Sequence, residues 1–121
     1  MSKAIEEYSL PGLMKLIEKV LNENNEPIQG LTAVYQFDIN GEEEGTHQLH
    51  FQDGKAVVKT GTENASDCTL SMSLANFHQF LLGKLNGTMA FMTGKLKIKG
   101  DIGKAIKIET ILRHYNLKEN L

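Results

Sequence analysis

The fold is indicated most clearly by residues 83–112, which read GKLNGTMAFMTGKLKIKGDIGKAIKIETIL. Residues 94–100 alternate strictly, with Leu96 and Ile98 between lysines. This period of two predicts a β-strand with one buried side. Asp101 follows at the position of a helix N-cap, ahead of apolar residues at helical spacing. The stretch therefore predicts a strand that leads directly into an amphipathic helix.

Upstream of this stretch, the period of two recurs in four segments. They are residues 31–39, the surroundings of Leu49 and Phe51, residues 55–60 and residues 68–73. Asn40-Gly41 and Asp53-Gly54 are turn sequences between the first three of these segments. Links of hairpin length predict that these three strands pair antiparallel.

Helical spacing appears in three further places. Ser9 is a predicted N-cap for a helix that starts near Leu10 and ends in the polar stretch from Asn22. Ser73 is a predicted N-cap for a short helix that ends near Gly83. Residues 86–93 are apolar but too few for more than a turn or two of helix.

Together these elements predict an α+β fold: a five-stranded antiparallel sheet with helices covering one face and an apolar cavity between them. The alternating strands predict that one sheet face is buried and the other is wet. The chain has the length of one typical domain, and it contains neither an internal repeat nor a linker. We expect residues 1–121 to form a single domain.

Composition excludes several classes of protein. The net charge of −2 lacks the basic excess typical of nucleic-acid binders. A single cysteine, Cys68, allows no intrachain disulfide and favours a reducing compartment. No apolar run approaches the roughly 20 residues that span a bilayer, and the first residues have no signal-peptide core. We expect a cytoplasmic protein that binds no nucleic acid.

The segment MAFMTGKLKIKGD (residues 89–101) and the helix after it closely resemble the sterol carrier protein 2 family of intracellular lipid-transfer domains. The family pattern is an Ala-Phe segment, then Gly-Lys-Leu-Lys-Ile-x-Gly-Asp, then an amphipathic helix. The order of predicted elements agrees from about Leu10 to Tyr115. Family members often carry a proline shortly before the Ala-Phe segment, where this chain has Gly87.

The resemblance implies an apolar tunnel that accepts acyl chains, acyl-CoA esters or sterol-like molecules. Methionine and aromatic residues cluster in the non-sheet segments, and flexible methionine side chains adapt to ligands of varied shape. The alternative is that these residues form only an ordinary core. The predicted ligand-binding residues are Met72, Phe77, Phe80, Leu81, Met89, Phe91, Met92, Ile98, Ile102 and Ile106.

A group of lysines accompanies the last strand and helix. They are Lys95, Lys97, Lys99, Lys104 and Lys107. One interpretation is that they attract a phosphate or carboxylate headgroup, or make transient contact with an anionic membrane surface. The other is that they are the solvated side chains of an edge strand, where lysine discourages aggregation.

The residues suited to catalysis or metal binding do not form a set. His47 and His50 are three apart on a strand, so they face opposite sides of the sheet and cannot chelate together. Cys68 has no flanking base and is typical of a packed residue. We therefore expect no catalytic residue, no metal and no cofactor.

The sequence predicts non-catalytic binding and intracellular transfer of an apolar, lipid-like ligand: a fatty acid, an acyl-CoA or a sterol-like molecule. The ligand would sit between sheet and helices, with the helix from Asp101 as the expected gate. The alternative function is a protein–protein interaction or dimerisation module that uses the same apolar groove. The oligomeric state stays open at this point.

Overall fold

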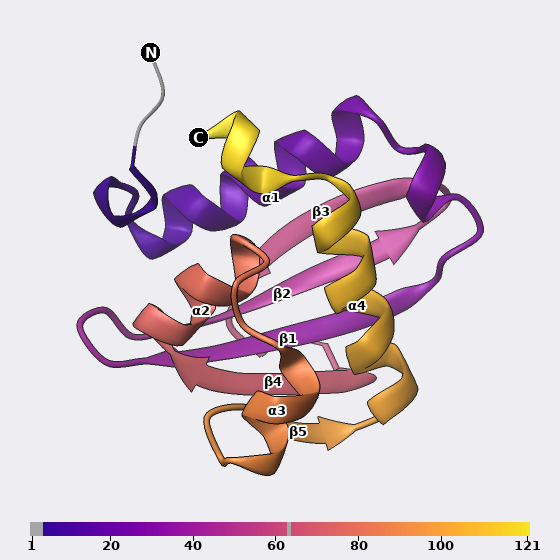
Figure 1. The fold of residues 1–121 in the computed structure, drawn as a ribbon. Helices are drawn as coiled ribbons and strands as arrows, with labels where there is room; N and C mark the ends of the chain where they lie inside the picture. The colour runs from indigo at the N-terminus through magenta and orange to yellow at the C-terminus, as the bar shows by residue number, and fades with distance from the viewer. Residues whose placement is uncertain (1–3, 63) are drawn as a thin grey trace.

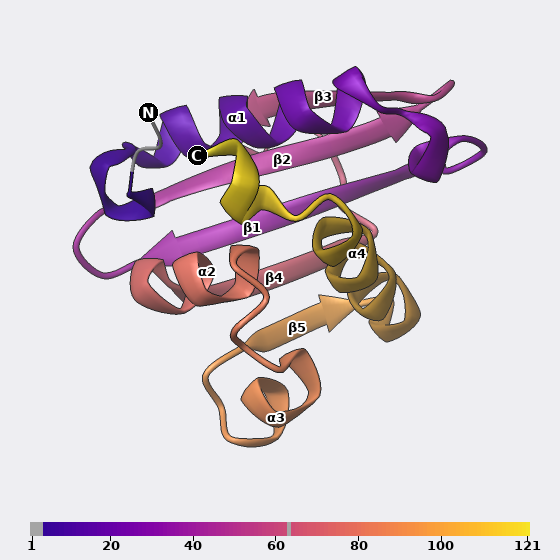
Figure 2. The ribbon, with the colours of Figure 1, turned by 45° about the horizontal axis from the view of Figure 1, so that its top comes forward.

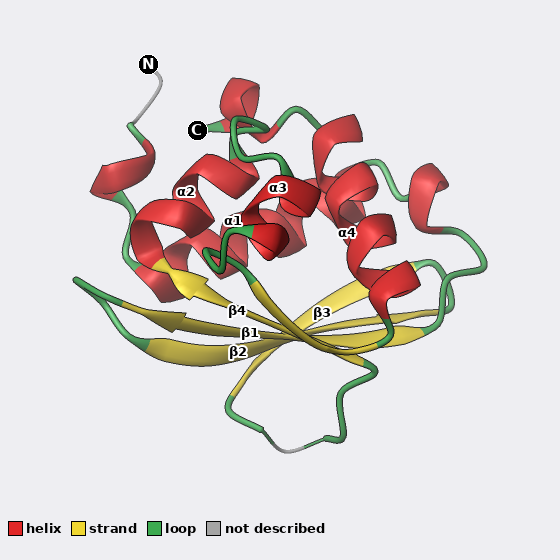
Figure 3. Ribbon diagram, turned by 60° about the horizontal axis from the view of Figure 1, so that its bottom comes forward, coloured by secondary structure: helices red, strands yellow, loops and turns green. Residues whose placement is uncertain are grey.

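The computed structural model describes residues 4–62 and 64–121, and it places the helices on one face of a twisted five-stranded sheet (Figures 1 and 3). The strands are β1 (Ala33–Asn40), β2 (Gly45–Gln52), β3 (Lys55–Thr60), β4 (Cys68–Ser73) and β5 (Lys97–Gly100). The helices are α1 (Leu10–Glu23), α2 (Leu74–Leu81), α3 (Gly87–Met92) and α4 (Ile102–His114). Short 3₁₀ turns are η1 (Ile5–Glu7), η2 (Glu26–Ile28) and η3 (Leu117–Asn120). The predicted α+β fold class is confirmed.

Each of the four α-helices starts at a side chain that caps it. The Ser9 hydroxyl accepts a hydrogen bond from the Gly12 amide at 3.1 Å, as the sequence predicts. Ser73 caps α2 and Asp101 caps α4 in the same way, both at 3.1 Å. Asn86 caps α3 through the Met89 amide at 3.0 Å. Local sequence alone therefore determines where these helices begin.

The strand order is β3-β2-β1-β4-β5, and one pairing differs from the prediction. β1 pairs with β2, and β2 with β3, antiparallel as predicted. However, β1 and β4 are parallel, which corrects the prediction of a wholly antiparallel sheet. A parallel neighbour requires a crossover, and the link between β3 and β4 makes it; its described residues, 61–62 and 64–67, lie on the open face of the sheet (Figure 3). Seven residues span roughly 20 Å, enough to pass two strands.

The crossover also explains a buried polar residue on the open face. Gln48 in β2 is fully buried, although the alternation predicts a wet position. Its amide nitrogen donates to the Asn64 carbonyl at 2.7 Å and to the Gln36 side chain at 3.0 Å. The link therefore covers part of the face that the strand pattern predicts to be solvated.

β5 is shorter than the predicted strand over 94–100. The Leu96 amide donates to the Ala90 carbonyl of α3 at 3.1 Å, so the residues before Lys97 pack on α3 instead of pairing with β4. Within the sheet, Phe37 of β1 lies in register with Leu70 of β4, which in turn pairs with Ile98 of β5. This row places Ile98 on the same face as the buried core residues.

Asp67 connects three elements at the start of β4. Its carboxylate accepts from the Val34 amide at 2.8 Å, and its own amide donates to the Val34 carbonyl at 2.8 Å. Its carbonyl accepts from the Asp101 amide at 3.0 Å, just before α4. Gly100 has a φ of +96°, and a Cβ there would overlap the Asp67 carbonyl oxygen. Only glycine therefore fits this close approach.

We predict that Gly100→Ala lowers the free energy of unfolding by about 2–4 kcal/mol, because it combines an unfavourable φ with a backbone overlap. The matched control is Gly94→Ala, where φ is +81° but no atom lies within 4 Å of the added Cβ. That change should cost only about 1–2 kcal/mol. Urea unfolding followed by circular dichroism measures both, and equal losses would contradict the role of the Asp67 contact.

Candidate apolar binding site

An apolar pocket of about 160 Å³ is lined mainly by residues of α3, β5 and α4. These three elements lie close together at the end of the molecule away from α1 (Figure 2). Apart from Gly87, Thr88 and Glu109, all of its lining residues are apolar. The apolar lining residues are Phe80, Phe91, Leu96, Ile98, Ile102, Ala105 and Ile106. A concave, mostly apolar hollow with few polar groups is the usual form of a small-molecule site.

The pocket exists because the helix layer is thin above the last strand. α3 has six residues and buries only Gly87 and Ala90, so it covers little of the sheet (Figure 2). On α4, Ile102 and Ile106 lie beside the buried Ala105 on the side that faces α3. Their side chains therefore remain about half exposed, at 50% and 58%.

Five of the ten predicted site residues line this pocket. They are Phe80, Phe91, Ile98, Ile102 and Ile106. They come from α2, α3, β5 and α4, so the fold gathers them from four separate elements. The predicted ligand contact of each residue remains a prediction.

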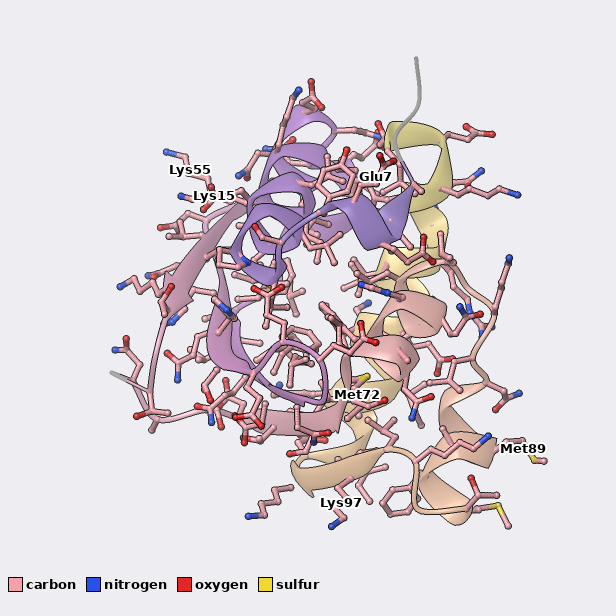
Figure 4. The ribbon with its side chains drawn as sticks, turned by 90° about the vertical axis from the view of Figure 1, so that its left-hand side faces the viewer. Glu7, Lys15, Lys55, Met72, Met89 and Lys97 are labelled. Atoms are coloured by element: carbon pink, nitrogen blue, oxygen red, sulfur yellow. The ribbon has the colours of Figure 1, made fainter. Side chains whose placement is uncertain are left out.

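The other five predicted residues lie elsewhere. Met72, Phe77 and Leu81 are buried in the core, where the Phe77 ring packs at 5.5 Å from that of Phe37. Met89 and Met92 are 59% and 75% exposed and do not line the pocket. Figure 4 shows Met89 pointing away from α3 into solvent, and Met72 inside the molecule.

The sequence also contained signals for lining residues that the prediction omitted. Leu96 lies two residues before Ile98 on the same side of the predicted strand. Glu109 follows Ala105 by four residues and Ile106 by three, so it shares their side of the helix. A rule that takes only apolar residues misses Glu109.

Glu109 joins α4 to the start of α3. Its carboxylate accepts from the buried Gly87 amide at 3.0 Å and pairs with Arg113 at 2.9 Å. A Cβ on Gly87 would overlap this carboxylate. The glycine therefore permits the contact, and Arg113 compensates the charge at the wall of the pocket.

Burial shifts the pKa values of three titratable residues in the core. Burial raises the pKa of Cys68 to about 11, so its thiol is protonated at neutral pH. Burial also raises the pKa of Tyr35, whose hydroxyl donates to the Lys104 carbonyl at 2.9 Å. Burial lowers the pKa of His47. Within residues 4–62 and 64–121, no three His, Cys, Asp or Glu side chains form a group that could hold a metal.

A second hollow of about 500 Å³ lies between η1, the β1–β2 turn and the start of α2. It is larger than the apolar pocket, but Glu6, Glu42 and Glu43 are among its lining residues. His78 also lines it, and the buried Nε2 atom of this residue has no hydrogen-bond partner in the part of the chain that the structure describes. A hollow with three carboxylate side chains in its lining suits an apolar ligand less well than the pocket beside β5 does.

Comparison with known proteins agrees with the fold and with the motif at this edge. The model of the SCP-2 sterol transfer family matches residues 13–113. The chain is 40% identical over 118 residues to "Hydroxysteroid dehydrogenase-like protein 2" of Xenopus tropicalis, covering 97% of this chain and 28% of that protein. It is 31% identical over 115 residues to "Sterol carrier protein 2" of Gallus gallus, covering 92% and 21%. The chain thus spans less than a third of either relative.

Among solved structures, the sterol carrier protein domain 2 of Helicoverpa armigera is similar with a TM-score of 0.76 and 28% identity. The match covers 96% of this chain and 94% of that one. Among the described helices, none is long and apolar enough to cross a membrane.

We predict that Glu109→Ala lowers the free energy of unfolding by about 1.5–3 kcal/mol, because it leaves the buried Gly87 amide without its acceptor. The control is Glu44→Ala in the exposed β1–β2 turn, which should stay within about 0.5 kcal/mol. Urea unfolding measures both variants. A loss at Glu109 no larger than at Glu44 would mean that the contact does not stabilise α3.

Proposed function

The chain belongs to the SCP-2 sterol transfer family, and on this premise we propose that it binds an apolar, lipid-like ligand in the pocket between α3, β5 and α4 and transfers it. The ligand class is a fatty acid, an acyl-CoA or a sterol-like molecule. One observation carries the proposal: half-exposed apolar side chains from α3 and α4 converge on a hollow whose floor is Ile98 and Leu96. Apolar residues exposed around a hollow are typical of a binding site.

The pocket must widen to admit a whole lipid. Its volume of about 160 Å³ is below the roughly 300–1,000 Å³ of typical small-molecule sites. Two of its lining residues, Phe80 and Leu96, are only 3% and 2% exposed. We propose that the end of an acyl chain enters the existing pocket and that movement of its cover opens the remaining space.

We propose α3 as the moving cover, although the sequence predicts α4. Four residues of α4 are buried, and the Tyr35 hydroxyl also anchors its first turn. α3 buries two residues and is held to α4 mainly through Glu109. Segments with few buried apolar contacts open at lower free energy, so α3 should open before α4.

We further propose that this chain has no catalysis of its own. Cys68 is buried and protonated, and Glu109, the ionisable residue of the pocket lining, is already engaged by the Gly87 amide and Arg113. The matched segment is only 18% to 28% of the relatives named after hydroxysteroid dehydrogenase, so their names do not assign an oxidoreductase activity to this part.

We predict that NBD-labelled stearate binds with a micromolar or tighter dissociation constant and is displaced by unlabelled oleate. Phe91→Asp should weaken binding at least tenfold, because it places a carboxylate in the apolar wall. Met92→Asp is the matched control: it introduces the same charge at the next residue of α3, outside the pocket.

Fluorescence titration in vesicle-free buffer measures these constants, with circular dichroism to compare folding. No saturable binding across acyl, sterol and aromatic probes would refute the proposal. If Met92→Asp proved as damaging as Phe91→Asp, the ligand would lie elsewhere. Native mass spectrometry tests the alternative function, since a stable dimer without bound lipid would favour an interaction module.

We predict that saturating stearate slows hydrogen exchange most strongly at the amides of residues 89–93, and little in β1. A ligand that binds only the closed form stabilises it by about 2.7 kcal/mol at a hundredfold excess over its dissociation constant, or about 100-fold in exchange rate. Protection confined to residues 106–112 would instead make α4 the moving element. Equal protection of β1 would indicate global stabilisation.

A further inference from the structure

Positive charge is concentrated in one part of this acidic chain. Residues 84–107 contain six lysines and one acidic residue, Asp101, for a net charge of +5. The rest of the chain has seven basic and fourteen acidic residues, for a net charge of −7. The overall charge of −2 is therefore the sum of two regions of opposite sign. A charged surface orients a protein with such an uneven charge distribution, because it attracts one region and repels the other.

The same segment carries the exposed apolar side chains. Six large apolar residues are exposed in the described part of the chain, and five of them lie between positions 89 and 106. Met92 and Met89 are the most exposed, at 75% and 59%. Neither lines the pocket, so a ligand inside it would leave both in water.

These charged and apolar residues lie together at one edge of the fold. α3, β5 and the first turns of α4 are adjacent at the end of the molecule away from α1 (Figure 2). Figure 4 shows Lys97 and Met89 at this end, while Lys15 and Lys55 project from the opposite end. We call this surface the β5 edge, defined by residues 87–107.

We propose that the β5 edge docks on an anionic phospholipid bilayer. Met89 and Met92 would enter the interface between headgroups and acyl chains, and the flanking lysines would lie at the level of the phosphates. The inference rests on the proposed function in one respect: docking in this orientation turns the mouth of the pocket toward the lipids that it would exchange.

A second copy of the chain suits this surface less well. A symmetric dimer places the same patch on both partners, so it would bring together two copies of the β5 edge, each with a net charge of +4. A bilayer rich in anionic lipid offers the opposite charge. Such a bilayer also repels the rest of the chain, which has a net charge of −6 outside residues 87–107, and so leaves the β5 edge as the face that can approach.

The test is binding of the full chain to vesicles of phosphatidylcholine with 30% phosphatidylglycerol, compared with pure phosphatidylcholine, by flotation at several salt concentrations. We expect binding to the anionic vesicles that weakens with salt. Each lysine close to such a surface strengthens binding about fivefold, so the triple variant K95Q/K97Q/K99Q should bind on the order of 100-fold more weakly.

The matched control removes the same charge from the opposite end, as K15Q/K19Q/K55Q, and should bind nearly as well as the unchanged protein, because salt screens charges that lie far from the docked surface. The chain contains no tryptophan, so Met92→Trp supplies a single fluorescent reporter. Its emission should shift to the blue with anionic vesicles, whereas that of Val57→Trp on β3 should not.

Several outcomes would overturn the docking proposal: equal binding to neutral vesicles, no binding to either, or equal weakening by both triple variants. A dimer in solution that Met92→Ser dissociates would assign the β5 edge to contact between copies and would also overturn it. Stearate titration of K95Q/K97Q/K99Q without vesicles separates the two proposals. If this triple variant binds stearate as the unchanged protein does but no longer binds vesicles, both the proposed function and the docking proposal are supported. If neither the unchanged protein nor any variant binds stearate, only the proposed function is refuted.

Discussion

The hydrogen bonds between Asp67 and Val34 are the constraint on which the rest of the structure depends. They run in both directions and place the start of β4 beside β1, at the end of a link that crosses the open face. The Asp67 carbonyl then holds Asp101, the cap of α4, and Gly100 permits the close approach. One residue therefore sets the positions of β4, of the end of β5 and of the start of α4.

The site is a consequence of where this arrangement places the edge of the sheet. β5 has four residues and the adjacent α3 has six, so the two layers do not close over each other there. In the middle of the sheet the helices bury the apolar side of the strands completely, as at Phe37 and Leu70. At β5 the same alternation continues in Ile98, but its cover is thin, and the unfilled space becomes the pocket. The pocket is therefore a part of the core that the helices cover incompletely.

The proposed ligand and the proposed membrane would contact different side chains of the β5 edge. Phe91 faces the pocket while its neighbours Met89 and Met92 face solvent, so one short helix supplies both a wall and an exposed surface. Lys97 and Lys99 alternate with Ile98, which separates the charge of the strand from the apolar floor of the pocket. Because side chains alternate along β5, Ile98 faces the pocket while Lys97 and Lys99 face away from it, and no lysine of this strand lines the pocket.

The sequence by itself determined the helix starts at Ser9, Ser73 and Asp101, the strand alternation and the family motif, because capping and periodicity depend on residues close together in the chain. Tertiary structure alone decided that β4 is parallel to β1, because the crossover depends on hydrogen bonds between residues 33 positions apart. It also decided which apolar residues face the pocket and which fill the core. Phe77 and Phe80 belong to one helix, yet only Phe80 lines the pocket. Phe77 packs on Phe37 of β1, whereas Phe80 lies beside pocket residues of α4. These neighbours are distant in the sequence, so the sequence around each phenylalanine does not predict them.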